Sequence, residues 1–444
     1  MTAILRFIAP FALLVSVNIF WLLSSWPISM SPDSLNVWSQ IQNGVYQNDH
    51  PVTYTIFVKM FSLGGNYLSL VSAVQLSILS IGILSVSYSL SRNFPLSMVI
   101  TSLVMITPTA GALASTLWKD VPFVGLLLIG FSLLVKNHTF FGLIFITLGA
   151  SLRHNGWTFL LSIAIFMTLF LILKNYSLRR YLWVIITSAV LSFSIIFLSA
   201  KLLDAKSAST WLTWSPALAD LAYIASRTPN NNSEIHETVA LYSTGDSLAR
   251  SADCTNINGM VFSTGFNEKN IDKNLGKILR EFLGLAKSDP KLILRLHSCR
   301  AQAFLPPPLS SGPSYFYWTQ MIIMEPNDYS LTPSPPIPLV RELGLKIWSV
   351  WDSQLKILLW PGLIVLVASF LFLFIYLRIY LKQINDVWLF WFVSMWGGLI
   401  SIIPWSGAQD FRYALFSYLI AQIIIIITTY QVFHRIKIRV SVKN

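Results

Sequence analysis

Long apolar runs separated by short polar segments dominate the pattern of this chain. There are ten such runs, of 14 to 24 residues. A helix needs about 20 apolar residues to cross a bilayer, so the pattern predicts an all-α polytopic membrane protein with about ten transmembrane helices. The predicted spans are residues 7–27, 67–90, 96–112, 121–135, 139–152, 157–173, 181–200, 358–379, 387–404 and 413–433. The fourth and fifth are short for this role.

Two longer polar stretches divide the chain into three predicted domains. Residues 1–200 form an N-terminal transmembrane module of about seven spans, with a first outer loop at 28–66. Residues 201–357 hold most of the acidic residues and form a large extracytoplasmic loop domain, in which an apolar pattern of helical period predicts an amphipathic helix over 269–287. Residues 358–444 form a C-terminal module of about three spans.

Composition and charge support a membrane protein and set its orientation. Charged residues make up 11% of the 444 residues, against about 25% in soluble domains. The net charge of +12 does not indicate a nucleic-acid partner, because basic residues gather in the connections on one side. With the N-terminus inside, four Lys or Arg residues lie in the short outer connections and eleven in the inner connections and tail. This is the positive-inside bias, and it predicts a multi-pass protein of the bacterial inner membrane.

The same topology brings the polar motifs to the outer ends of the spans. They are Asp33, Asp49-His50-Pro51, Trp118-Lys119-Asp120, Arg153-His154-Asn155-Gly156 and Gln409-Asp410-Phe411-Arg412-Tyr413. Charged side chains near a bilayer are costly and often functional. Their gathering on one face predicts an active site that faces the periplasm or exterior.

These residue types suit sugar transfer from a lipid phosphate. A carboxylate is needed to accept the proton of the attacking hydroxyl, and Asp33 and Asp49 are the candidates. Cations are needed where phosphate charge develops, and Lys119, Arg153 and Arg412 are the candidates. His50, Asp120 and Asn155 complete the predicted substrate-binding set.

Each of these residues also has a purely structural interpretation. Asp33 can cap the helix that follows it, Asp49 can cap a helix starting at Pro51, and Asp120 can cap the next span. Arg153 and Arg412 can be flanking residues that extend towards the interface. The histidines can hold turns by hydrogen bonds.

Two further predictions concern cysteine and metal chemistry. Cys254 and Cys299, the only cysteines, both lie in the predicted loop domain. An oxidising compartment favours a disulfide between them over two free thiols. A pair of carboxylates on the outer face can hold Mg²⁺ or Mn²⁺, although no ligand spacing requires a metal.

The first loop resembles that of the GT-C glycosyltransferases. An Asp opens the loop, and Asp49-His50-Pro51 follows about 16 residues later, as in the protein O-mannosyltransferases and the lipid A aminoarabinose transferases. Residues 118–123 and 153–156 resemble segments of bacterial GT-C-like proteins, and the layout is also similar to phage-type O-antigen glucosyltransferases. The mannosyltransferases have Asp-Glu where this chain has Asp33-Ser34, and two prolines where one follows His50.

The resemblance implies a GT-C-like bundle with Asp33 as catalytic base. It further implies inverting transfer from a polyprenyl-phosphate-linked sugar to a glycan or lipid-linked acceptor, among membrane lipids. Two alternatives stay open. One is a transporter or flippase for a lipid-linked or small anionic substrate, and the other is a glycan ligase or polymerase.

Overall fold

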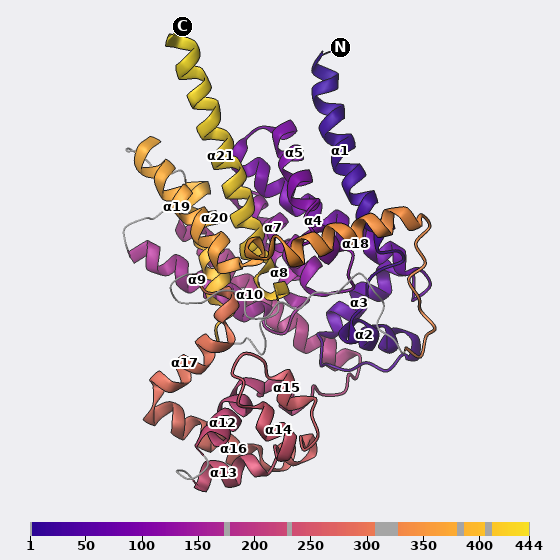
Figure 1. Ribbon diagram of the computed structural model, residues 1–444, viewed down its shortest axis with the longest axis vertical. Coiled ribbons are helices and arrows are strands. Elements are labelled where there is room, and N and C mark those ends of the chain that lie inside the picture. Colours follow the sequence, from indigo (N-terminus) through magenta and orange to yellow (C-terminus); the bar gives the residue numbers. More distant parts are fainter. Residues whose placement is uncertain are drawn as a thin grey trace. The chain divides into compact units, whose positions relative to one another are not determined.

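The computed structural model describes residues 2–172, 178–228, 233–306, 327–379, 386–404 and 411–443, and these residues form helices without a β-sheet (Figure 1). Each of the ten predicted apolar runs lies on a helix. These helices are α1 (Thr2–Ser24), α4 (Leu68–Ser91), α5 (Phe94–Met105), α7 (Asp120–Val135), α8 (Thr139–Ser151), α9 (Gly156–Ile172), α10 (Arg179–Leu202), α19 (Pro361–Ile379), α20 (Asp386–Ile400) and α21 (Leu415–Lys443).

Within the part of the chain that the structure describes, four helical segments are long and apolar enough to cross a membrane. They are Arg6–Ser24, Leu68–Ser91, Arg179–Leu202 and Phe411–Phe433. The other apolar helices of the described residues have 10–17 residues in their apolar parts. The structure therefore supports a helical membrane protein with four candidate spans, which is fewer than the ten predicted from the sequence.

The shorter apolar helices pack closely through small residues. A Cβ atom added at Gly142 of α8 would lie 3.1 Å from the carbonyl oxygen of Gly130 on α7. One added at Gly82 of α4 would lie 2.8 Å from the carbonyl oxygen of Gly125, also on α7. Small residues let apolar helices approach closely where lipid provides no hydrophobic drive between them. α7 is consequently enclosed between α4 and α8, which explains why nearly all its side chains are buried.

The described residues divide into two compact units. Unit 1 comprises Met1–Lys206, Trp318–Ile400 and Arg412–Asn444, and unit 2 comprises Ser207–Tyr317 and Ser401–Phe411. The predicted loop domain ended at residue 357, but α18 (Pro338–Ser353) belongs to unit 1. It packs on the end of α1, where the hydroxyl of Ser24 donates to the carbonyl of Val340 over 3.1 Å.

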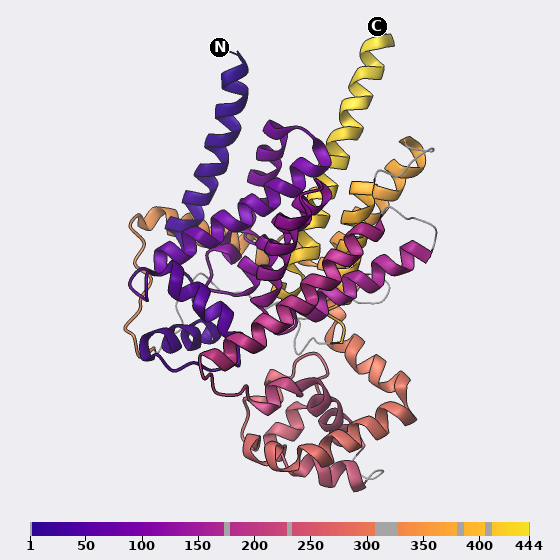
Figure 2. The same cartoon turned by 180° about the vertical axis from the view of Figure 1, so that it is seen from behind.

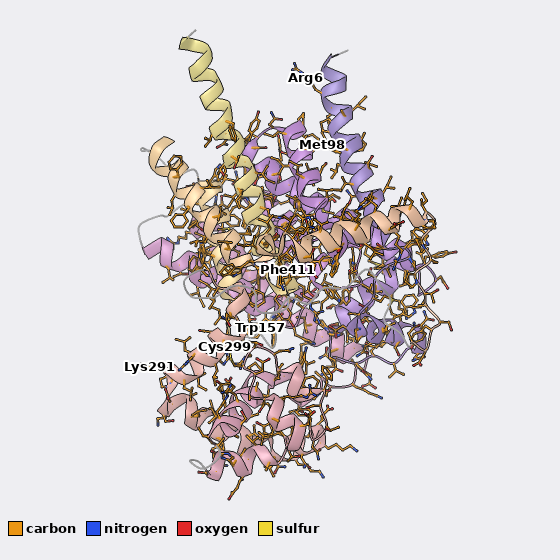
Figure 3. The ribbon with its side chains drawn as sticks, in the orientation of Figure 1. Arg6, Met98, Trp157, Lys291, Cys299 and Phe411 are labelled. Atoms are coloured by element: carbon orange, nitrogen blue, oxygen red, sulfur yellow. A yellow bond between two sulfur atoms is a disulfide. The ribbon has the colours of Figure 1, made fainter. Side chains whose placement is uncertain are left out.

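Unit 1 places both chain ends on the same side (Figures 1 and 2). The free ends of α1 and α21 lie there, whereas α2 (Pro32–Asn43) and α3 (Val52–Phe61) lie beyond the other end of α1. Figure 3 shows Arg6 near the chain ends and Trp157 towards the opposite end of the unit. Two termini on one side are expected for an even number of crossings.

Unit 2 is a small helical domain with its own core. The predicted amphipathic helix is α16 (Glu268–Ser288), whose Ile271 and Ile278 are fully buried. They pack with residues of the other unit 2 helices, which are α11 (Thr210–Thr213), α12 (Ser215–Arg227), α13 (Ser233–Ala240), α14 (Gly245–Arg250), α15 (Asn258–Val261) and α17 (Pro290–Arg300).

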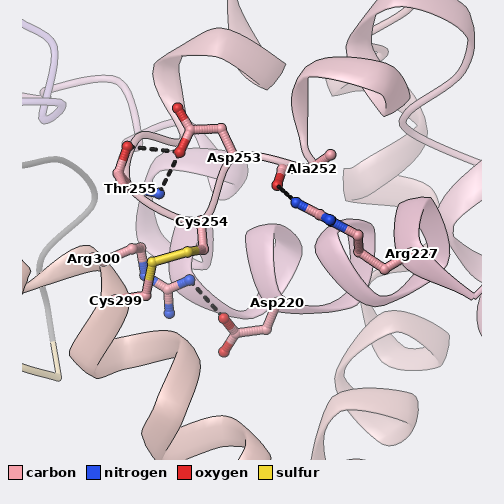
Figure 4. Close-up of a disulfide and its surroundings, with 8 residues drawn as sticks. All are labelled: Asp220, Arg227, Ala252, Asp253, Cys254, Thr255, Cys299 and Arg300. Carbon is pink, nitrogen blue, oxygen red and sulfur yellow. Dashed lines mark hydrogen bonds and ion pairs between the residues drawn. A yellow bond between two sulfur atoms is a disulfide. The ribbon is translucent and has the colours of Figure 1, made fainter.

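A disulfide and a buried carboxylate attach α17 to earlier parts of this domain (Figure 4). Cys254 and Cys299 are bonded, which is the pairing that the sequence favours. Beside them, Asp220 of α12 is completely buried and accepts a 2.6 Å hydrogen bond from Nη1 of Arg300. Nε2 of His297 lies 3.1 Å from the same carboxylate. Both links attach α17 to the rest of unit 2.

Candidate functional site

The first outer loop is fixed to the segment before α7 by backbone and side-chain bonds. Ser29 exchanges backbone hydrogen bonds with Ser115 and Leu117, of 2.9 and 2.8 Å. At the start of α2, the hydroxyl of Ser34 accepts from the Ser31 amide and donates to the Leu117 carbonyl. Nε1 of Trp118 donates to the Ser31 hydroxyl over 2.8 Å.

These contacts decide the role of Asp33 in α2. Ser31 occupies the N-cap position, and Ser34 completes a capping box with it. The capping interpretation of Asp33 is therefore wrong. Asp33 lies in the first turn of α2 with its carboxylate available for other partners.

Two side chains from distant segments lie beside the Asp33 carboxylate, and a third contacts one of them. Nη1 of Arg412, just before α21, lies 3.0 Å from Oδ2 of Asp33. Nε2 of His50, in the loop before α3, lies 3.8 Å from Oδ1. Lys119 Nζ, at the start of α7, hydrogen-bonds to Nδ1 of His50. The structure thus brings together four of the residues that the sequence predicts for the site.

Burial and charge set the protonation of this Asp33 cluster, defined as Asp33, His50, Lys119 and Arg412. Burial acts to raise the pKa of Asp33, but the neighbouring positive charges, led by Arg412, hold it well below its ordinary value. Burial, and then the charge of Lys119, lower the pKa of His50 to about 3. Burial lowers the pKa of Lys119 to about 8. At neutral pH the cluster holds an ionised carboxylate, a neutral imidazole and two cations.

The cluster is open on the side of the carboxylate. The Asp33 side chain has a relative exposure of 43%, against 12% for His50 and 15% for Arg412. A soluble or membrane-bound reactant can therefore reach the one acidic group of the cluster.

Asp120 and Arg153 form a second ion pair that is buried. Nη1 of Arg153 lies 2.7 Å from Oδ1 of Asp120, and their side chains are 7% and 1% exposed. The Arg153 guanidinium is also 5.2 Å from the centre of the Phe123 ring. This geometry favours a structural role over the phosphate-binding role that the sequence predicts for Arg153.

Aromatic rings connect the two arginines. The guanidinium carbon of Arg412 lies 4.7 Å from the Trp118 ring and 5.5 Å from the Tyr413 ring. That of Arg153 lies 5.4 Å from the Tyr413 ring. Cation–π contacts of this kind orient a guanidinium without using its donors. Sequence analysis gave no role to Trp118 and Tyr413, although both lie within its motifs.

The remaining predicted residues lie around the site in structural positions. Nε2 of His154 donates to the carbonyl of Asn48 over 2.7 Å, and burial lowers the pKa of His154 to about 4. Asp49 is half-buried, and its charge acts on His154. Pro51, not Asp49, takes the N-cap position of α3. The backbone carbonyl of Asn155 accepts from the amide of Phe159 at the start of α9.

Gly156 explains the tight turn that carries Arg153. A Cβ atom at this position would clash with the carbonyl of Ala150 in α8. Only glycine therefore allows α9 to begin so close to the end of α8, which directs Arg153 towards Asp120.

The described residues contain no cluster of side chains that could bind a metal ion. No three His, Cys, Asp or Glu side chains gather there in a way that could hold a metal ion. Gln409 and Asp410, part of the last predicted motif, lie outside the described residues.

Comparison with known proteins gives no match to a family model, a curated protein or a solved structure.

Proposed function

We propose that the protein is a membrane glycosyltransferase of GT-C type, with its active site facing the periplasm or exterior. The donor is a sugar on a polyprenyl phosphate, and the acceptor is a glycan or lipid-linked hydroxyl. The observation that carries this proposal is the Asp33 cluster, in which a half-exposed, ionised carboxylate pairs with Arg412 and a second cation, Lys119, is held nearby through His50. Both groups that the transfer requires are present within one site.

The proposed reaction is a single displacement at the anomeric carbon. The acceptor hydroxyl forms the new C–O bond while its proton passes to the Asp33 carboxylate. The bond between the anomeric carbon and the phosphate oxygen breaks, and the polyprenyl phosphate leaves with the bonding electrons. Attack opposite to the leaving group inverts the configuration. Arg412 and Lys119 stabilise the charge that develops on the phosphate.

The low pKa of Asp33 fits this role once the donor is considered. With only the protein's own groups nearby, Arg412 holds the carboxylate ionised, so it is ready to accept a proton at neutral pH. A phosphate bound to Arg412 partly neutralises the positive charge of the guanidinium. Arg412 then stabilises the Asp33 carboxylate less, so the pKa of Asp33 rises. The base thereby becomes stronger when the donor is in place.

The test compares surface glycans by mass spectrometry in otherwise identical bacterial strains. One strain lacks the gene, one carries it, and two carry Asp33→Asn or Asp49→Asn, a matched change in the same loop. We expect a mass increment of one sugar per repeat or per chain with the unchanged protein and with Asp49→Asn. We expect no increment with Asp33→Asn, at equal protein levels in the membrane.

Two outcomes would contradict the proposal. An increment that survives in the Asp33→Asn strain excludes Asp33 as the base and directs attention to Asp49. No increment in any strain across several hosts favours a transporter or flippase.

Binding of polyprenyl phosphate to the purified protein gives a second test. If Arg412 contacts the phosphate, Arg412→Gln should weaken this binding about 10- to 150-fold.

A further inference from the structure

A stripe of basic residues follows one face of α16. With 100° between successive residues of a helix, its members fall within an arc of about 80°. All of them are exposed. The basic stripe consists of Lys269, Lys273, Lys277, Arg280 and Lys287.

The stripe points away from the interior of unit 2. The opposite face of α16 carries Ile271 and Ile278, which are fully buried in the unit 2 core. The charge continues onto the next helix, where Lys291 and Arg295 are exposed. Figure 3 shows Lys291 at the start of α17.

Positive charge in unit 2 is concentrated in residues 268–300. Between residues 207 and 306, eight of the ten Lys and Arg residues lie in this stretch together with four of the nine acidic residues, which gives it a net charge of +4. Among the described residues, no carboxylate lies within 4 Å of a cation of the stripe. Glu281 acts electrostatically on Lys277 and Arg280 at the edge of the stripe. The five exposed cations still outnumber the three acidic residues of α16, so this helix presents a net positive field to an anionic surface.

We propose that the basic stripe of α16 binds the anionic phospholipid headgroups of the membrane that holds this protein. The chain enters unit 2 at Ser207, only five residues after Leu202 ends a candidate membrane span. A tether of this length keeps the domain close to the bilayer. Leu283 borders the stripe and is 64% exposed, so an apolar side chain accompanies the cations, as at membrane-binding surfaces. This inference does not depend on the proposed function.

The experiment uses the full chain in lipid nanodiscs and follows hydrogen–deuterium exchange of peptides from 268–295. Discs of phosphatidylcholine alone are compared with discs that also contain phosphatidylglycerol. We expect slower exchange in the anionic discs and recovery of fast exchange at high salt. Each cation near an anionic bilayer strengthens binding about fivefold. Lys273→Gln with Lys277→Gln should therefore lower the equilibrium constant for association of the stripe with the anionic bilayer about 25-fold, seen as faster exchange in the anionic discs.

A matched variant removes the same charge elsewhere on unit 2. Arg227→Gln with Arg250→Gln changes two exposed cations outside α16 and α17, and it should leave the protection intact. Equal exchange in both kinds of disc would overturn the proposal. So would equal losses in the two double variants. Protection in neutral discs by a soluble anionic glycan, without an effect of phosphatidylglycerol, would identify a glycan as the partner instead.

Discussion

Removing one partner of the buried Asp120–Arg153 pair should destabilise the protein more than removing both. The interacting atoms are 2.7 Å apart, and the side chains are 1% and 7% exposed. With an effective dielectric constant of about 20, this distance corresponds to an attraction of about 6 kcal/mol. Burial of two ions costs several kcal/mol each, so the net value of the pair is small. A single lone ion is the costly state.

The variants are Asp120→Asn, Arg153→Met and the combination of both. Each single change should lower the free energy of unfolding by about 3–5 kcal/mol, because it leaves one charge buried without its counter-ion. The double change leaves no charge and should cost no more than the milder single change. Unfolding of the purified full chain by denaturing detergent, followed by circular dichroism, measures all three values.

The exposed pair of Arg250 and Asp246 provides the control. Its Nε–Oδ2 distance is a similar 2.8 Å, but its side chains are 59% and 44% exposed. Exposed pairs couple by about 0.2–1 kcal/mol, so the same cycle on Arg250→Met and Asp246→Asn should be nearly additive. If the losses of unfolding free energy at Asp120 and Arg153 also simply add, burial does not determine the value of this pair.

Three further predictions follow from the charges and the disulfide. Burial lowers the pKa of Lys119 to about 8, so the side chain loses its positive charge as the pH rises through that value. The affinity for polyprenyl phosphate should fall over the same pH range, and Lys119→Arg should remove this pH dependence. The folded-state pKa of His154 is lowered to about 4 from 6.5, so the unfolded chain binds the proton first, and the free energy of unfolding should fall as pH decreases over this range; His154→Gln should flatten the curve in an acid titration. Cys254→Ser with Cys299→Ser opens a loop with a sequence separation of 45 and should cost unit 2 about 4 kcal/mol, measured as faster limited proteolysis.

The sequence predicted the helices better than the way they pack. Apolar runs reveal helices directly, and each predicted run lies on one. Spanning length is harder to predict, because Gly130 and Gly142 allow α7 and α8 to pack closely while remaining short. The polar character of residues 327–357 suggested a loop domain. α18 instead contacts the end of α1 through a hydrogen bond from the Ser24 hydroxyl to the Val340 carbonyl, a contact between distant residues that no local pattern reveals.

The site was predicted by residue type, but its pairings were not. Asp33 and Arg412 are separated by 379 positions, and nothing in a local pattern can join them. Local pattern also left the role of Asp33 open between base and helix cap, because Ser31 and Asp33 are both good capping residues and only the contacts of Ser31 with Ser34 and Trp118 identify Ser31 as the cap. The structure does bring Asp33, His50, Lys119 and Arg412 together, as expected of poorly solvated charges that need partners.

Exposure separates the roles of two arginines that are alike in sequence. Arg153 and Arg412 both lie beside one end of a predicted span, both pair with an aspartate, and both contact the ring of Tyr413. The partner of Arg153 is sealed from solvent, so this pair can only hold α7 and the start of α9 together. The partner of Arg412 has an exposed carboxylate, and under the proposed function an incoming phosphate competes for that guanidinium. Because the Tyr413 ring contacts both guanidinium groups, it links the buried pair to the exposed one.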